Sequence, residues 1–157
     1  FNVENNSGKK EPFCFRLINM HEQYFMPPSL SSFWLLSLVQ SSCSLSIHNP
    51  SSELLERMGN MKNMGTRGAI TVFTICGSLM ADFANKQKVS GFMFNGVPDR
   101  HGPYKHFASL ISKKTNYKYT IHNGSTPFQL QYYIFYDNDS IKNEVVTILR
   151  DIGQIDD

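Results

Sequence analysis

The sequence has little of what marks several classes of protein at first sight. Lys and Arg number 15 against 13 Asp and Glu, so the net charge of +2 is too balanced to predict a nucleic-acid binder from bulk charge. The longest apolar run, 33–39, has the length of a strand and falls well short of the roughly 18 residues of a membrane span. Hydrophobic residues still make up 41% of the 157 residues, which is enough for a core. We therefore expect a globular chain with no membrane partner.

Cysteine is also scarce, and its spacing excludes two kinds of site. Cys14, Cys43 and Cys76 form an odd, widely spaced set, which does not make a disulfide framework. The sequence has no Cys-x-x-Cys pair, and so neither a zinc ribbon nor a thioredoxin-type centre is expected. We predict reduced and mostly buried thiols, and a cytoplasmic location.

Common catalytic and metal-binding strings are missing as well. The sequence contains no Gly-x-Ser-x-Gly, Walker A or His-Glu-x-x-His string. Residues 137–139 imitate the start of an EF-hand loop, but Lys142 stands where that loop needs glycine and Ile148 where it needs glutamate. Calcium is therefore rejected, and no metal site is predicted.

Hydrophobic periodicity divides the chain into a polar start and one folded domain. Residues 1–11 are polar and are expected to be a flexible lead-in, while 12–157 are expected to form a single α+β domain. In the first part of this domain, alternation predicts three or four short antiparallel strands, at 13–18, 24–26, 33–39 and 45–47. Residues 51–68, with several glycines and asparagines, are expected to be flexible, with one or two helical turns.

The second part of the chain predicts helices and strands in alternation. The expected elements are a helix at 69–87, a strand at 89–94, a helix from 104 to about 115, strands at 117–122 and 128–136, and a helix up to 152 capped by Asp139 or Ser140. The helix at 69–87 has a narrow polar face and a wide apolar arc that includes Phe73 and Leu79, so we expect it to be buried on most sides. The predicted fold is α+β, with a mixed, mostly antiparallel sheet and two or three helices.

The order of elements from 44 to 136 resembles the second half of the GCN5-related N-acetyltransferase (GNAT) fold. In that family the turn before the long helix carries Arg/Gln-x-x-Gly-x-Gly/Ala, and its backbone N–H groups bind the pyrophosphate of acetyl-coenzyme A. The matching string here is Lys-Asn-Met-Gly-Thr-Arg-Gly at 62–68, with lysine in the first position and Arg67 in the slot of the second small residue. The motif is therefore degenerate.

This resemblance implies a cofactor site and a general acid. The cofactor-binding residues would be Gly65, Thr66, Arg67 and Gly68. Tyr104, at the head of the second helix, would protonate the leaving thiolate. Both assignments have a structural alternative. The glycine turn also fits an ordinary loop leading into a helix, and Tyr104 also fits a packing role because it opens an apolar stripe.

A second resemblance covers about 40 residues. The residues concerned are Ala-Ile-Thr-Val-Phe-Thr at 69–74, Asp82-Phe83, Phe92-Met93-Phe94, Arg100 and Tyr104. Their pattern is similar to one in small uncharacterised proteins of bacteriophages and bacteria. That group has no activity that the resemblance could imply for this chain. It implies a virion or accessory role, with a virion location if the protein is phage-encoded.

Two further clusters are candidates for chemistry or binding. A catalytic base would have to come from a polar group such as Asp99, Arg100, His101 and His106 beside the second helix, which also fits a solvated loop. Basic and aromatic residues gather at the end of that helix, where single-stranded nucleic acid could stack: Lys113, Lys114, Tyr117, Lys118 and Tyr119. The alternative for this patch is a solvated helix end.

The sequence favours a non-enzymatic binding or structural protein on a degenerate GNAT-like scaffold. The broken glycine motif and the lack of a carboxylate tied to the site point to this class, for which no cofactor is expected. The alternative is an acyl-coenzyme A-dependent N-acyltransferase that uses acetyl-coenzyme A. Phe33 and Trp34 are consecutive and must face opposite sides of one strand. We therefore expect a protein partner or a homo-oligomer to cover one of those sides.

Overall fold

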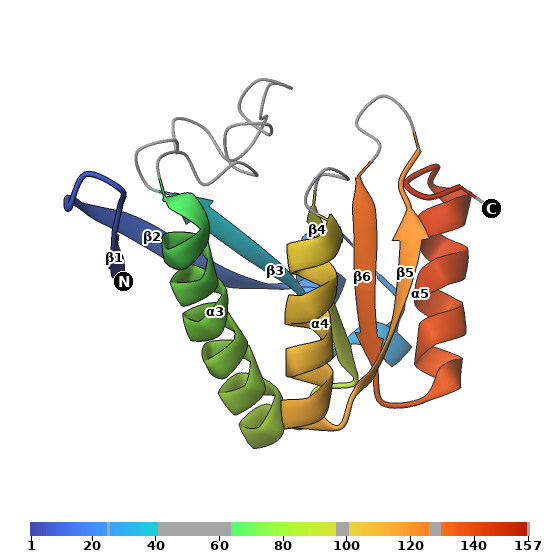
Figure 1. Cartoon of the computed structure of the whole chain (residues 1–157). Coiled ribbons are helices and arrows are strands. Elements are labelled where there is room, and N and C mark those ends of the chain that lie inside the picture. Colours follow the sequence, from blue (N-terminus) through green and yellow to red (C-terminus); the bar gives the residue numbers. More distant parts are fainter. Residues whose placement is uncertain (25, 41–63, 97–100, 126–129, 157) are drawn as a thin grey trace.

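The computed structural model describes residues 1–24, 26–40, 64–96, 101–125 and 130–156 (Figure 1). The strands are β1 (Asn2–Glu4), β2 (Lys10–Asn19), β3 (Phe33–Gln40), β4 (Gly91–Gly96), β5 (Lys118–Asn123) and β6 (Gln131–Tyr136). The α-helices are α1 (Met20–Tyr24), α3 (Gly65–Gln87), α4 (His101–Thr115) and α5 (Asp139–Asp151), with a 3₁₀ turn, η1 (Pro28–Leu30). The predicted α+β class is confirmed, and the five-residue α1 is an addition to the expected helices.

The six strands form one mixed sheet in the order β1-β2-β3-β4-β6-β5. Every neighbouring pair is antiparallel except β3 and β4, which are parallel and are joined through α3. The β3–β4 ladder is short. It pairs only Phe33 with Gly91, Trp34 with Phe92 and Leu35 with Met93, although both strands continue further. Figure 1 shows β3 and β4 running apart beyond this ladder.

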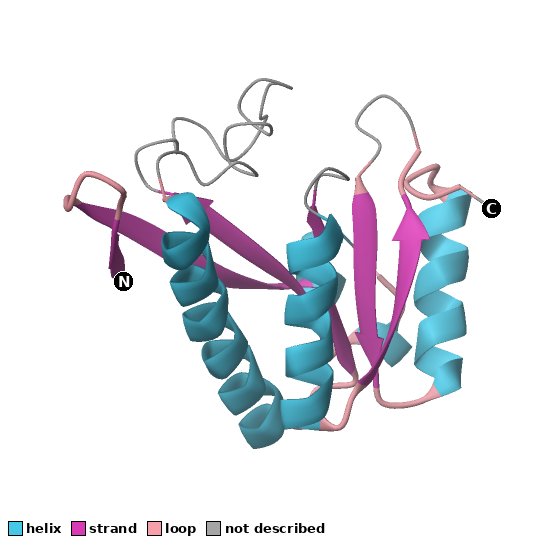
Figure 2. Ribbon diagram, viewed as in Figure 1, coloured by secondary structure: helices cyan, strands magenta, loops and turns pink. Residues whose placement is uncertain are grey.

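Helices cover both faces of the sheet (Figure 2). Helices α3 and α4 pack on one face, over a core that includes Phe92, Phe94 and Tyr133. Helix α5 packs on the other face, over a second core that includes Met93 and Ile134. This division follows from strand geometry, because successive side chains of a strand point to opposite faces.

Helix α3 buries one stripe and exposes more than its sequence predicts. The buried residues recur every fourth position and lie against the sheet: Gly68, Val72, Cys76, Met80 and Ala84. The expected wide burial is wrong at Ile70 and Leu79, which are 60% and 44% exposed. By length and mean hydropathy alone, this helix could also cross a membrane, but core helices pass the same test.

The first residues of the chain join the sheet. Strand β1 lies within the expected lead-in 1–11 and pairs with β2, and its Val3 side chain is buried. The strand expected at 24–26 is contradicted at its first residue, because α1 extends through Tyr24. The strand expected at 45–47 and the stretch 51–63 lie outside the described residues, as does Cys43.

Both faces of β3 are covered by the chain itself. Trp34 packs edge-on against Phe83 of α3, with ring centroids 5.1 Å apart. Phe33 points the other way and is buried in the core on the α5 side. The aromatic residues of β3 therefore give no reason to expect a partner on either side.

Candidate functional site

The two helices that carry the predicted site begin at the same end of the sheet. Strands β3 and β4 are parallel, and α3 and α4 start near their carboxyl ends (Figure 1). The start of a helix presents unpaired N–H groups and the positive end of its dipole. This edge of the sheet, beside the point where β3 and β4 separate, is the candidate site.

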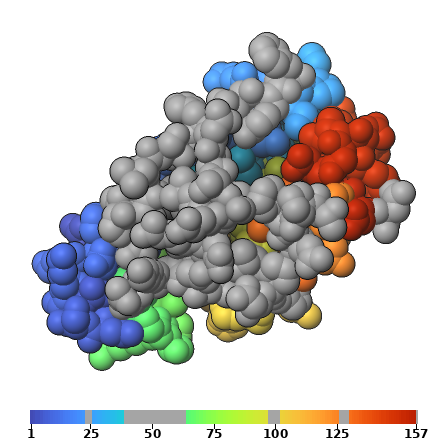
Figure 3. All heavy atoms as spheres, turned by 90° about the horizontal axis from the view of Figure 1, so that it is seen from above, coloured from blue at the N-terminus to red at the C-terminus, as the bar shows by residue number. Residues whose placement is uncertain are grey.

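The first predicted residue, Gly65, opens α3 in a conformation that favours glycine. Its φ is +64°, and the preceding residue Met64 makes no side-chain capping bond to the helix. A Cβ at Gly65 would lie 2.3 Å from Oδ1 of Asn6, in the turn between β1 and β2. Figure 3 shows this turn, in blue, beside the start of α3, in green. The N-terminal hairpin therefore packs on the beginning of the helix.

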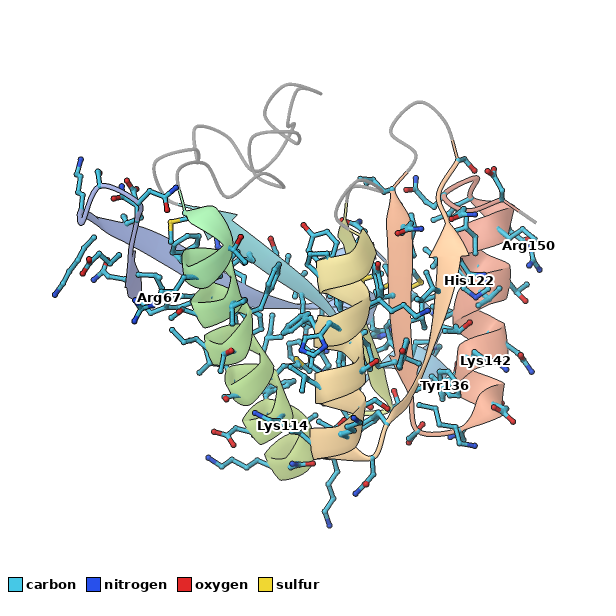
Figure 4. The ribbon with its side chains drawn as sticks, in the orientation of Figure 1. Arg67, Lys114, His122, Tyr136, Lys142 and Arg150 are labelled. Atoms are coloured by element: carbon cyan, nitrogen blue, oxygen red, sulfur yellow. The ribbon has the colours of Figure 1, made fainter. Side chains whose placement is uncertain are left out.

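The other three residues of the turn do not converge on one point. Gly68 is buried, and a Cβ there would lie 3.1 Å from Cε of Met64 and 3.5 Å from the carbonyl oxygen of Glu4. Thr66 and Arg67 are exposed. Arg67 lies on the side of α3 that faces β1, away from α4 (Figure 4). An anion at this helix start would meet Thr66 and backbone N–H groups, with the Arg67 guanidinium to one side.

Tyr104 is buried beneath the start of α4. Its ring makes edge contacts with Phe73, Phe94 and Tyr133, at centroid distances of 5.5, 6.2 and 6.1 Å. The ring also covers the last residue of β4, since a Cβ at Gly96 would lie 2.3 Å from Cε2 of Tyr104. These contacts support the packing role that its apolar stripe indicates.

A second tyrosine, which the sequence analysis did not select, shares this environment. Tyr133 is fully buried, and its hydroxyl donates a 3.4 Å hydrogen bond to Oε1 of Gln131. Burial, and secondarily the phenols of Tyr104 and Tyr119, raise the pKa of Tyr133 to about 12. Tyr133 is therefore a neutral hydrogen-bonding group at neutral pH. Its position in an apolar strand predicted only that it is a core residue.

The remaining predicted clusters do not form a site among the described residues. Asp99 and Arg100 lie outside the described part of the chain, only the backbone of His101 is described, and His106 is exposed on α4. In the described ranges no three His, Cys, Asp or Glu side chains are placed to hold a metal ion.

The basic-aromatic patch is divided between the surface and the interior. The Tyr117 hydroxyl donates to the carbonyl oxygen of Val89, and the Tyr119 hydroxyl lies 3.0 Å from Oγ of Ser109. Both rings pack against the core, while Lys113, Lys114 and Lys118 are exposed. Both tyrosines are therefore half-buried, with part of each ring held against the core.

One further polar group lies near the divergence of β3 and β4. Nε1 of Trp34 is buried and has no hydrogen-bond partner within the described structure. Trp34 occupies the second of the three paired positions, one residue before the ladder ends. The pairing of β3 with β4 joins residues about 60 apart in the sequence. No local sequence pattern therefore predicted that Trp34 lies where these two strands separate.

Comparisons with known proteins return no relatives. No family model matches the chain, and neither a curated protein nor a solved structure matches it significantly.

Proposed function

We propose that the protein binds an acyl-coenzyme A on a GNAT-like scaffold. The pantetheine arm would lie between β3 and β4, and the pyrophosphate would lie at the start of α3. The observation that carries this proposal is the parallel β3–β4 pair, which is joined through α3 and separates after three residue pairs. The resemblance of the sequence to the GNAT pattern supports the same location.

The divergence leaves backbone groups that a ligand can use. Beyond Leu35 and Met93, β3 is paired only with β2 and β4 only with β6 among the described strands. The pantetheine arm contains amide groups, and an extended chain of amides can pair with a strand edge as a peptide does. Helix α3 has no acidic residue in its first turn, so its positive end is not neutralised there.

Binding is better supported than acyl transfer. Tyr104, the predicted general acid, is buried among aromatic rings and covers Gly96. Gly68 is buried against Met64 and the Glu4 carbonyl and is not open to a ligand, whereas Gly65 is exposed at the start of α3. These two observations favour the second candidate, a non-enzymatic interaction protein that retains the scaffold without its chemistry.

The experiment is a titration of the 157-residue chain with acetyl-coenzyme A by calorimetry, together with thermal unfolding. A ligand that binds only the folded state raises stability by about 2.7 kcal/mol at a concentration of 100 Kd. Absence of binding heat and of any thermal shift at millimolar acetyl-coenzyme A would remove this proposal and leave the interaction protein.

A charge variant locates the site. Thr66→Asp places a carboxylate in the first turn of α3, where it suits the helix dipole but repels a pyrophosphate. We expect weaker coenzyme binding with no loss of fold stability. Asn143→Asp, at an exposed position of α5, changes the net charge equally and should leave binding unchanged. Gly68→Asp is unsuitable, because the new side chain would press on Met64 and on the Glu4 carbonyl.

Acyl transfer is tested separately. Thiol release from acetyl-coenzyme A in the presence of amine acceptors would show an acyltransferase, and Tyr104→Phe should then slow it if the phenol is the acid. Coenzyme binding without thiol release, in both the parent chain and this variant, would identify a binding protein.

A further inference from the structure

An open hollow lies at the end of the sheet opposite to the candidate coenzyme site. Helices α3 and α4 both end there, and the turn from β6 to α5 lies beside them (Figure 1). The hollow has a volume of about 300 Å³, and its lining includes Asn85, Lys88, Asn116, Tyr117 and Asp137. Because α3 has 23 residues, its two ends are about 35 Å apart, so a ligand here does not reach the start of α3.

Polar side chains of the lining are available to a ligand. Within the described residues, the amides of Asn85 and Asn116 make no hydrogen bond and the Lys88 ammonium makes no ion pair. Asp137 accepts a 3.1 Å hydrogen bond from Nδ2 of Asn138, and a carboxylate can accept several more. All of these side chains are exposed. A ligand would therefore find donors and acceptors without breaking bonds of the fold.

Both helices end here on a residue in the left-handed conformation that carries a side chain. Lys88 has a φ of +49° and a ψ of +50°, and Asn116 has a φ of +62°. Glycine adopts this conformation at the least cost and is the usual residue after a helix. The lysine and the asparagine place an ammonium group and an amide at the rim of the hollow, which glycine could not do.

Tyr117 supplies an aromatic wall. Its ring meets Phe92 edge-on, with centroids 5.5 Å apart, and its hydroxyl donates to the carbonyl oxygen of Val89. The ring is thus held in one position, half-buried, and borders the hollow. Burial raises the pKa of Tyr117, and the negative charge of Asp137 raises it further. The carboxylate and the phenol therefore belong to one site.

Lysines give this end of the molecule an excess of positive charge. Five of them are exposed at the ends of α3 and α4 and the start of β5: Lys86, Lys88, Lys113, Lys114 and Lys118. Figure 4 shows Lys114 at this end. Each helix end contributes about half a negative charge, so the lysines leave the region positive even with Asp137 in the lining. The surroundings attract an anion and oppose a free cation.

We propose that the hollow binds a guanine nucleotide, with the base against Tyr117 and the phosphate toward Lys88. The inference is independent of the proposed coenzyme site. Guanine carries two adjacent donors, N1–H and N2–H, for the Asp137 carboxylate, and its O6 and N7 atoms can accept from the amides of Asn85 and Asn116. Stacking of a base on an aromatic side chain is common where nucleic-acid bases are unpaired.

Other small ligands would use only part of the hollow. An amine could pair with Asp137, but it would enter a region of excess positive charge. An inorganic phosphate or a small carboxylate could pair with Lys88, but it would be repelled by Asp137 and would leave the Tyr117 ring unused. A guanine nucleotide joins a donor edge, an aromatic plane and an anion in one molecule, and the volume of the hollow lies at the lower end of the roughly 300–1,000 Å³ of small-molecule sites.

The first test is a calorimetric titration of the 157-residue chain with guanosine 5′-monophosphate (GMP) and with adenosine 5′-monophosphate (AMP). We expect GMP to bind about tenfold more tightly, because AMP lacks the paired donors that Asp137 accepts. Asp137→Asn should weaken GMP binding by about tenfold and abolish the preference over AMP. Asp151→Asn, at an exposed position in the last turn of α5, changes the net charge equally and should have no effect.

A second variant tests the phosphate end. Lys88→Gln should weaken GMP and AMP by the same factor, because both carry the phosphate. Lys105→Gln, at an exposed position of α4, removes the same charge away from the hollow and should leave both affinities unchanged. Thr66→Asp, at the other end of α3, should also leave GMP binding unchanged, so this site and the proposed coenzyme site can fail separately.

The same chemistry is present in a free nucleotide and in one residue of a single-stranded nucleic acid. A single-stranded tetranucleotide with one guanine distinguishes these sources. Tighter, salt-sensitive binding of the tetranucleotide, weakened by Lys118→Gln, would identify a strand, because further phosphates would meet the lysines outside the hollow. Affinity equal to that of GMP would identify the free nucleotide.

Three results would overturn the inference. The first is the absence of binding heat for both GMP and the tetranucleotide at millimolar concentration. The second is GMP binding that neither Asp137→Asn nor Lys88→Gln weakens. The third is equal affinity of the parent chain for GMP and AMP, which would show that Asp137 does not recognise guanine.

Discussion

Tyr104 lies directly over the backbone of Gly96. A Cβ at Gly96 would be 2.3 Å from Cε2 and 2.9 Å from Cζ of the tyrosine ring. The last residue of β4 and the first turn of α4 are thus in contact across residues 97–100, and only glycine leaves room for the ring.

This contact predicts that Gly96→Ala is destabilising. The methyl group must displace the Tyr104 ring, which is held by Phe73, Phe94 and Tyr133. Overpacking of this kind costs about 1–3 kcal/mol, measurable by urea unfolding. Gly102→Ala is the control, because nothing lies within 4 Å of a Cβ there, and alanine in α4 should raise stability by up to about 1 kcal/mol. Equal effects of the two changes would contradict the packing of Tyr104.

A second prediction separates two apolar residues of α3 that look alike in the sequence. Phe73 packs against Phe107 and Tyr104, with centroids 5.2 and 5.5 Å away, whereas Leu79 is 44% exposed. Phe73→Ala should lower the free energy of unfolding by about 3 kcal/mol, near the bottom of the range for buried phenylalanine because the ring is only half-buried. Leu79→Ala should cost less than about 1 kcal/mol in the monomer. A larger loss at Leu79 would mean that this face of α3 is covered.

Much of the fold could be predicted from periodicity, and the failures have physical causes. The predicted elements from residue 69 onward match α3 to α5 within a few residues, because each carries a clear period of 3.6 or 2. Strand β1 was missed because it is only three residues long and its one buried side chain is Val3. The apolar residues at 24–26 predicted a strand, yet α1 extends through Tyr24.

The candidate site was harder to predict, because its geometry comes from contacts between distant residues. The glycine turn before α3 could be predicted from its residue types. The packing of Asn6 against Gly65 could not, because these residues are 59 positions apart in the sequence. The stripe containing Tyr104 indicated packing, and the structure agrees. The parallel pairing of β3 with β4 and its early end, which carry the proposed function, have no local sequence signature.

The cap of α5 gives a third prediction. The sequence suggested Asp139 or Ser140, but the side chain of Asn138 accepts the hydrogen bond from the Ile141 N–H, at 3.1 Å. Asn138→Ala should therefore lower stability by about 1 kcal/mol. Asn143→Ala, at an exposed position inside the same helix, should raise it by a few tenths of a kcal/mol or leave it unchanged. A neutral Asn138→Ala would show that the cap does not contribute.

A fourth prediction concerns His122 of β5, whose side chain lies on the side of the basic residues Lys142 and Arg150 of α5 (Figure 4). Burial lowers the pKa of His122 below its ordinary value of 6.5, and the positive charges of Arg150 and Lys142 lower it further. Arg150→Gln should therefore raise this pKa in an NMR titration, and Lys113→Gln on α4 should not.

The lowered pKa of His122 also sets the sign of its effect on stability. The unfolded chain takes up this proton at a higher pH than the folded chain does. The contribution of His122 is therefore present above about pH 6.5 and is lost as the pH falls through the lowered value. His122→Asn should flatten that part of the stability profile, and an unchanged acid slope in this variant would contradict the assignment.

The last prediction concerns the alkaline side of the same profile and depends on Cys76. This thiol is buried in the stripe of α3 that faces the sheet, and burial raises its pKa from 9.0 to about 12. An unfolded chain loses the proton near pH 9, while the folded chain keeps it, so unfolding becomes easier as the pH rises from 9 toward 12. By about pH 10.5 the thiol should have removed about 2 kcal/mol of the stability present at neutral pH, because the slope approaches 1.36 kcal/mol for each pH unit once the pH is above 9. Tyr133, with its pKa raised to about 12, adds to the fall in stability above pH 10.

Urea unfolding at pH 7, 9 and 10.5 measures how stability changes with pH. Cys76→Ala shifts the whole curve by the constant effect of the lost sulfur, but it should remove the part of the alkaline fall that begins near pH 9. Parallel curves for the two proteins would show that Cys76 titrates alike in the folded and unfolded states, and that water reaches this side of α3.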